Sequence, residues 1–284
     1  MKKLLIFLIY LCLSLFKVNS ALAFDISKLG VHILNLSELQ DAKKLVSPDS
    51  STKPHADIQL LPMSVMSIED QKVLGINTEV EYEKWSYITI PLTLSDASDD
   101  NLKKWQSFFD NARILKIIPI VRLTTEYSHE ENSWNVPNKN DVIKQIEFLS
   151  KLNWPTDQRH IIIYNEVNHA KEWGGYLDPE EYSRILRFAS NWAHTELKNY
   201  VVLPAGMDLS APSSHNTRES FTYLTQMLEY DPEIFSYVDI WNSHSYPNPG
   251  FISAPTSYGK ISLRGFQYEL AFLKLKTGKD YKVM

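Results

Sequence analysis

The sequence predicts an α/β fold, namely an incomplete TIM-type (β/α)8 barrel with about six βα units and the start of a seventh strand. Three observations support this class. Short apolar runs alternate with segments whose apolar residues recur at helical spacing, polar side chains stand where several apolar runs end, and the chain stops within a further apolar run. Such alternation is typical of βα units that build a parallel sheet.

Residues 1–23 are predicted to be a signal peptide. Lys2 and Lys3 give a positive start, residues 4–16 form a short apolar run, and residues 21–23 (Ala-Leu-Ala) fit a small-residue cleavage site. An uncleaved membrane anchor is the alternative, although the apolar run is shorter than the ~20 residues of a spanning helix. We expect a secreted or periplasmic protein.

Cleavage would leave residues 24–284 as one barrel domain. Cys12 is the single cysteine, and its loss together with Lys2, Lys3 and Lys17 changes the formal charge from −5 to −8. Without disulfides, the domain must be stabilised by a large core. This acidic balance does not suggest nucleic acid, or any membrane contact beyond export, as a partner.

The first half of the domain contains three strand-helix pairs. The strands are predicted at residues 29–34, 85–92 and 114–123. The helices are predicted at residues 37–46, 101–112 and 141–152. A polar stretch at residues 47–55 interrupts the alternation as an excursion.

The second half continues the pattern. Strands are predicted at residues 160–165, 200–206 and 235–246, with helices at 180–197 and 262–278. Asp178 and Pro179 are typical of an N-cap and a first helical turn, and Gly278 is typical of a C-cap. Residues 281–284 (Tyr-Lys-Val-Met) resemble the start of a seventh strand. We therefore expect a fragment, because two further units of about 30 residues each would complete the barrel.

Asn165 and Glu166 stand at the end of the fourth predicted strand, where a barrel builds its site. A solvated loop carboxylate, or a cap for the next helix, is the alternative for Glu166. Asp178 already fills the cap position, which favours a functional role. The apolar strand before Glu166 would hold its carboxyl group rigidly.

Further candidates come from other strands. His244 and Tyr246 share one face where the sixth predicted strand ends, unless the histidine is a core residue beneath a packed tyrosine. Arg122 follows a very apolar strand, as a buried partner for carboxylates or as a surface residue. His32 lies within the first strand, where a core histidine is the alternative.

Trp173 follows Glu166 closely and Trp241 precedes His244, so both are candidates to stack on the apolar faces of sugar rings. Ordinary core packing is the alternative for both. The remaining histidines do not show metal-ligand spacing, and no phosphate-binding glycine loop is present, so neither a metal nor a cofactor is expected.

These residues resemble the 4/7 superfamily of glycoside hydrolases, the barrel clan that includes families 5, 39 and 53. The resemblance rests on Tyr-Asn-Glu at 164–166 and on His-Ser-Tyr at 244–246. It implies that Glu166 is the general acid/base and that Asn165 binds the sugar 2-hydroxyl. His244 and Tyr246 would orient the nucleophile or bind the sugar. Val167 stands where the clan usually has proline.

The resemblance also implies a glutamate nucleophile at the end of strand seven, beyond Met284. The sequence thus predicts a retaining glycoside hydrolase acting on a poly- or oligosaccharide, with the present fragment inactive alone. The alternative is a non-catalytic carbohydrate-binding barrel. A metal-dependent hydrolase is disfavoured by the lack of clustered ligands.

Overall fold

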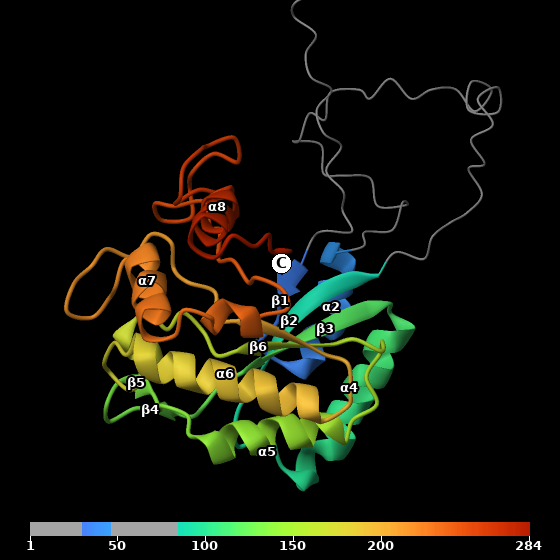
Figure 1. Ribbon diagram of the computed structural model, residues 1–284. Helices are drawn as coiled ribbons and strands as arrows, with labels where there is room; N and C mark the ends of the chain where they lie inside the picture. The colour runs from blue at the N-terminus through green and yellow to red at the C-terminus, as the bar shows by residue number, and fades with distance from the viewer. Residues whose placement is uncertain (1–29, 47–84) are drawn as a thin grey trace, which may run out of the picture.

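The computed structural model describes residues 30–46 and 85–284 (Figure 1). The predicted signal peptide and the polar excursion at 47–55 lie outside these residues. Within the described part of the chain, no helix combines the length and apolar character that crossing a membrane requires.

A five-stranded parallel sheet forms the centre of the fold. Its strands are β1 (Gly30–His32), β2 (Ser86–Leu92), β3 (Ile117–Leu123), β6 (Arg159–Ile163) and β7 (Tyr200–Pro204). Each strand pairs with the one before it in that order, always in parallel. A doubly wound sheet would reverse its strand order, whereas a barrel adds strands in sequence. The predicted α/β class is confirmed, and its topology is that of a partial TIM barrel.

Helices connect successive strands and cover the outer face of the sheet. They are α2 (Leu39–Val46), α4 (Leu102–Ile114), α5 (Lys139–Ser150) and α6 (Pro179–Thr195), with α5 and α6 side by side (Figure 1). The predicted cap of α6 is present, because the Asp178 carboxylate accepts a 2.8 Å hydrogen bond from the Glu181 amide. Asn138 caps α5 in the same way.

Two apolar clusters lie on opposite faces of the sheet. The large core lies between the sheet and the outer helices and includes the fully buried Ile88, Ile90 and Leu92 of β2. A small cluster lines the inner face and contains Ile120, Ile162, Val201 and Leu203. Burial on both faces explains why the strand segments are so apolar in the sequence.

The predicted sixth strand at 235–246 is not a regular strand. It begins with a 3-10 turn, η5 (Ile234–Tyr237), and continues as an extended segment with isolated bridges. Side chains form hydrogen bonds with backbone groups of β7 that a regular strand ladder would use. The Asp239 carboxylate accepts from the Val202 amide at 2.7 Å, and Asn242 Nδ2 donates to the Pro204 carbonyl at 3.1 Å. Such competition from polar side chains is a known cause of interrupted ladders.

The structure contains further elements that were not predicted. These are α7 (Ser220–Tyr230) and a hairpin of β4 (Tyr127–Ser128) and β5 (Ser133–Trp134). The last predicted helix is present as α8 (Gly265–Thr277), and Gly278 ends it with a left-handed φ of 71°. Val283 forms a parallel bridge with Trp241, so residues 282–284 run beside the sixth segment.

Candidate active site

The backbone at the carboxyl end of β6 is strained. Tyr164 and Glu166 have φ angles of 66° and 32°, in the left-handed region that side chains with a Cβ disfavour. The Tyr182 hydroxyl holds the strand ends together, since it donates to the Ile163 carbonyl at 3.1 Å and accepts from the Ala205 amide at 2.7 Å. Strain of this kind concentrates at functional sites, where surrounding contacts maintain it.

Glu166 and His244 are brought together by this strand end. Oε1 of Glu166 lies 2.8 Å from Nδ1 of His244, and the two side chains are 24% and 15% exposed. The Glu166 amide donates to the Gly206 carbonyl at 3.2 Å, directly after β7. The carboxyl group is therefore held at the rim of the sheet by its backbone and by an imidazole.

Asn165 lies in a chain of polar contacts between Arg122 and Glu172. Arg122 Nη1 donates to Asn165 Oδ1 at 2.7 Å, and Asn165 Nδ2 donates to Glu172 Oε2 at 3.3 Å. Burial raises the pKa of Glu172, while the hydrogen bond from Asn165 and the Arg122 charge oppose this shift. Burial lowers the pKa of Arg122, against the charges of Glu172 and Glu166. These contacts fix the orientation of the Asn165 amide.

A cavity of about 730 Å³ follows the inner face of the sheet. His32, Arg122, His244 and Tyr246 line it together with the apolar residues Ile120, Ile162 and Leu203. Glu166 does not line the cavity itself but is hydrogen-bonded to His244, which does. The cavity thus combines apolar walls with convergent polar groups, as ligand sites do.

Electrostatics keep parts of the cavity wall uncharged near neutral pH. Partial burial, followed by the charges of Arg122 and His244, lowers the pKa of His32 to about 4. Burial and the charge of Glu166 raise the pKa of the Tyr246 phenol. His32 is therefore a neutral imidazole and Tyr246 a neutral hydroxyl, and both are able to hydrogen-bond a neutral ligand.

A second histidine–carboxylate pair, not predicted from the sequence, lies beside the site. His169 Nε2 is 2.9 Å from Asp208 Oδ2, and the His169 amide donates to the Glu166 carbonyl. The hydrogen bond to Asp208 raises the pKa of His169, and the same bond holds the pKa of Asp208 well below its usual range. The sequence position of His169 gives no sign of Asp208, so the pair could not be found from the sequence.

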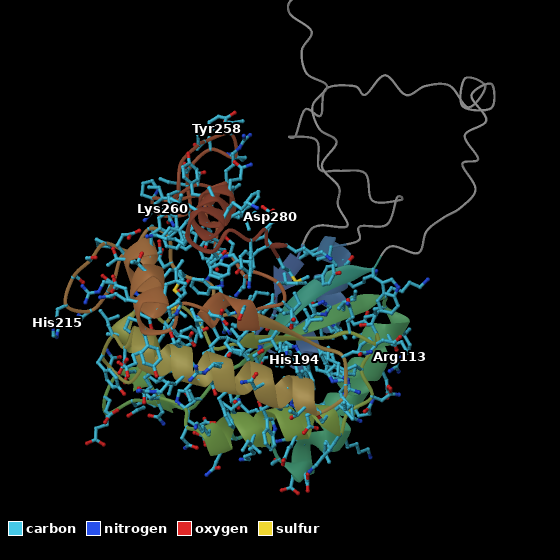
Figure 2. All side chains as sticks on the ribbon, viewed as in Figure 1. Arg113, His194, His215, Tyr258, Lys260 and Asp280 are labelled. Carbon is cyan, nitrogen blue, oxygen red and sulfur yellow. The ribbon has the colours of Figure 1, made fainter. Side chains whose placement is uncertain are left out.

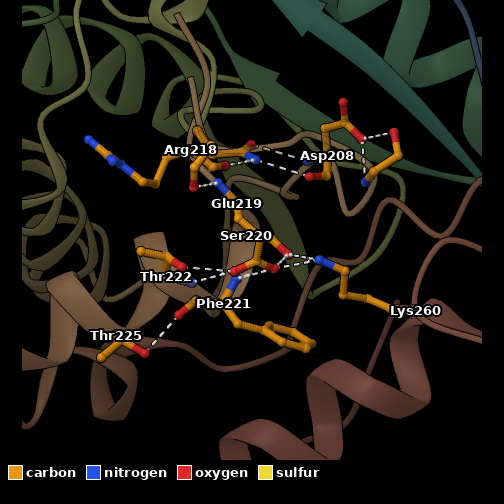
Figure 3. A network of polar contacts seen from close by, with 11 residues as sticks. Asp208, Arg218, Glu219, Ser220, Phe221, Thr222, Thr225 and Lys260 are labelled. Atoms are coloured by element: carbon orange, nitrogen blue, oxygen red, sulfur yellow. Dashed lines mark hydrogen bonds and ion pairs between the residues drawn. The ribbon is translucent and has the colours of Figure 1, made fainter. Parts of the chain in front are cut away.

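Buried polar contacts join the loops around the site. The Asn168 side chain donates to the carbonyls of Asp208 and Arg218 at 3.0 Å each and accepts from the Asp208 amide at 3.1 Å. Figure 3 shows how this region continues to Glu219, which caps α7 and forms an ion pair with Lys260. The loops after β6 and β7 are thereby tied to the loop before α8.

The two tryptophans proposed for sugar stacking are core residues. Trp173 and Trp241 are both 0% exposed, so neither has a ring face available to a ligand. Trp173 contacts Tyr164 and Tyr182 edge-on, and its indole N–H donates to Glu181 at 3.3 Å. The indole N–H of Trp241 donates to Glu269 at 3.1 Å. Their closeness in sequence to Glu166 and His244 therefore reflects packing in the core beneath the site.

Within residues 30–46 and 85–284, no group of three histidine, cysteine or acidic side chains is placed to hold a metal ion. The site in this part of the chain therefore consists of hydrogen-bonding and acid–base groups: Glu166 and His244 on one side, and Arg122, Asn165 and Glu172 on the other.

No protein-family model matches this chain, and no curated protein matches its sequence. Among solved structures, it is similar to AbfB, a family 51 α-L-arabinofuranosidase from Bifidobacterium longum, with 12% identity and a TM-score of 0.37. The match covers 63% of this chain and 37% of that enzyme, so the chain spans less than half of its length. This likeness assigns no residue.

Proposed function

We propose that this chain forms the acid/base side of a retaining glycoside hydrolase that acts on a poly- or oligosaccharide. The observation that carries the proposal is the 2.8 Å contact between Glu166 and His244 at the carboxyl end of β6, beside a cavity with neutral polar groups. The strained backbone on both sides of Asn165 supports it.

Glu166 is the proposed general acid and then general base. In the first step it gives its proton to the glycosidic oxygen as that oxygen leaves the sugar carbon and a nucleophilic carboxylate bonds to the same carbon. In the second step the Glu166 carboxylate takes a proton from the water that attacks this carbon and displaces the nucleophilic carboxylate. The His244 imidazole suits both states, because a ring nitrogen can accept from the acid or donate to the carboxylate.

The other groups orient the sugar. The Asn165 Oδ1 accepts from Arg122 and one Nδ2 hydrogen goes to Glu172, which leaves the second Nδ2 hydrogen for a sugar hydroxyl. A retaining enzyme also needs a nucleophilic carboxylate about 5 to 5.5 Å from the acid. Following the resemblance to the 4/7 superfamily, we propose that this nucleophilic carboxylate lies after Met284. We also propose that the protein acts outside the cytoplasm.

The test is a set of aryl glycosides assayed with the protein expressed from its full reading frame. Glu166→Gln should lower turnover about 10²- to 10⁴-fold on substrates with poor leaving groups, the range that general acid catalysis contributes. The loss in the glycosylation step should be much smaller for dinitrophenyl glycosides, because their leaving group needs no proton.

Glu130→Gln is the matched control, since Glu130 is exposed in the turn of the β4–β5 hairpin. It should behave like the unmodified protein. Equal turnover by Glu166→Gln and Glu130→Gln on every substrate would remove Glu166 from the mechanism. Saccharide binding without turnover by the unmodified protein would instead support the non-catalytic carbohydrate-binding barrel.

A further inference from the structure

We infer that Tyr246 and Phe251 form a second sugar-binding subsite, which extends from the proposed site along the loop before α8. This inference rests on the proposed function and adds where a second sugar unit of the substrate binds. Three rings form a row: the centroids of His244 and Tyr246 are 5.4 Å apart, and those of Tyr246 and Phe251 are 5.3 Å apart. The row begins at the imidazole that contacts Glu166.

Phe251 is exposed in a conformation that is unfavourable for its side chain. It is 66% exposed, and its φ angle of 62° lies in the left-handed region. Neither core packing nor local backbone preference accounts for a phenylalanine there, since glycine would fit better. A large apolar side chain held in strain at the surface is typical of a binding position.

The loop holds Phe251 in place through its backbone. The Asn248 amide donates to the Ile261 carbonyl at 3.0 Å, and the Ser253 amide donates to the Pro247 carbonyl at 2.9 Å. These two bonds fix the chain on both sides of the ring. The Phe251 ring is therefore held in a fixed position relative to Tyr246.

A sugar ring is the occupant that fits this row. Its C–H face is apolar and stacks on aromatic rings, while its hydroxyl groups stay hydrated at a surface that is open to solvent. Tyr246 also carries a phenolic hydroxyl, a group that can hydrogen-bond such a unit. Continuity with Glu166 through His244 indicates that the unit belongs to the same saccharide chain as the bond to be cleaved.

Tyr258 provides a matched control within the same loop. It is 75% exposed, but the Arg264 guanidinium lies over its ring at 4.2 Å from the centroid. Figure 2 shows Tyr258 at the outer end of the loop, above α8. It is an equally exposed aromatic residue that lies outside the row.

The experiment measures binding without turnover, by retardation in native gels that contain arabinoxylan, galactomannan, mixed-linkage β-glucan or dextran. All proteins carry Glu166→Gln, which should slow hydrolysis of the polysaccharide enough for binding to be measured. The reference protein should be retarded by at least one polysaccharide. Adding Phe251→Ala should weaken that binding about fivefold, since an aromatic contact contributes roughly 1 kcal/mol. Phe251→Tyr should keep the binding, and Tyr258→Ala should not change it.

Phe251→Gly separates binding from folding. It relieves the left-handed strain, so its midpoint of thermal unfolding should be equal to or above that of the reference protein while polysaccharide binding is lost. Equal retardation of Phe251→Ala and the reference protein would overturn the inference, as would no retardation in any gel. The catalytic proposal depends on the aryl glycoside assay, so the two can fail separately.

Discussion

The imidazole of His244 lies directly over Gly206, so closely that a methyl group added at Gly206 would stand 2.3 Å from Cδ2 of the ring. Gly206 also accepts the hydrogen bond from the Glu166 amide. The residue after β7 thus provides both the space for His244 and an anchor for Glu166. The absence of a side chain at Gly206 is what permits the contact between the two functional groups.

Gly206→Ala should displace His244 from Glu166. We expect a loss of about 1 to 3 kcal/mol in the free energy of unfolding, the usual effect of overpacking a tight site. Urea unfolding measures it. In a His244→Ala background the same change should cost much less, because the clashing ring is gone. An equal loss of unfolding free energy in both backgrounds would show that the added methyl group does not clash with His244.

Arg122 and Glu172 should be energetically coupled through Asn165. Arg122→Met removes a cation whose charge favours the partly buried Glu172 carboxylate, and Glu172→Gln removes a charge that favours the Arg122 guanidinium. A double-mutant cycle by urea unfolding should therefore give a coupling of about 1 kcal/mol or more between the two positions. Independent, additive effects would contradict the contact chain from Arg122 to Glu172.

Local sequence patterns were sufficient to predict the strands of the sheet and the capped ends of α6 and α8. β2 lies within the predicted 85–92, and Asp178 and Gly278 cap their helices as predicted, because these features depend on periodicity and short-range hydrogen bonds. The strand ends also placed Glu166 near His244. Carboxyl ends of parallel strands meet at one rim, and the segment that carries His244 runs beside β7 to that rim although it is not a regular strand.

Features that depend on distant partners were not predictable. Trp173 and Trp241 stand close in sequence to Glu166 and His244, as site residues would, but both are buried beneath the site. Distance along the sequence does not distinguish a core residue from a site residue. Glu172 joins the site through its hydrogen bond with Asn165, and Asp208 through its contact with His169. Both contacts involve loops, whose shapes cannot be predicted from the periodicity of the sequence. The predicted sixth strand is irregular because the Asp239 carboxylate and the Asn242 amide bond to backbone groups of β7 that a full ladder would use.

Asn168 should be essential for the loop structure around the site. Its fully buried amide makes three hydrogen bonds to the backbone of the loop between β7 and α7. Asn168→Ala leaves those backbone groups without their partner, and each such buried group costs about 1 to 3 kcal/mol. We expect a total loss of about 3 kcal/mol in urea unfolding.

Asn140→Ala is the control for this change, because Asn140 is an exposed residue in the first turn of α5. It should alter the free energy of unfolding by less than about 0.5 kcal/mol, as surface substitutions usually do. Similar losses for Asn168→Ala and Asn140→Ala would mean that the buried amide does not join the loops.

Glu269 on α8 supports the segment that carries His244. It is fully buried and accepts hydrogen bonds from the Trp241 indole and the Ser243 hydroxyl. Burial raises its pKa to about 7, although both hydrogen bonds and the charge of Lys260 oppose the shift. The carboxyl group is therefore protonated in mildly acidic solution and becomes charged near neutrality.

The stability of the protein should depend on pH through this group. Its folded pKa of about 7 lies above the unfolded value of 4.5, so its contribution is fully present below pH 4.5 and is lost as the pH rises through 7. Glu269→Gln mimics the protonated acid and should remove this loss. Measured by urea unfolding, the stability of the unmodified protein relative to the variant should fall by up to about 3 kcal/mol between pH 4.5 and 8. Ser243→Ala removes a hydrogen bond that favours the charged form and should move the change to higher pH. A difference between the unmodified protein and Glu269→Gln that does not vary with pH would show that Glu269 does not titrate in this range.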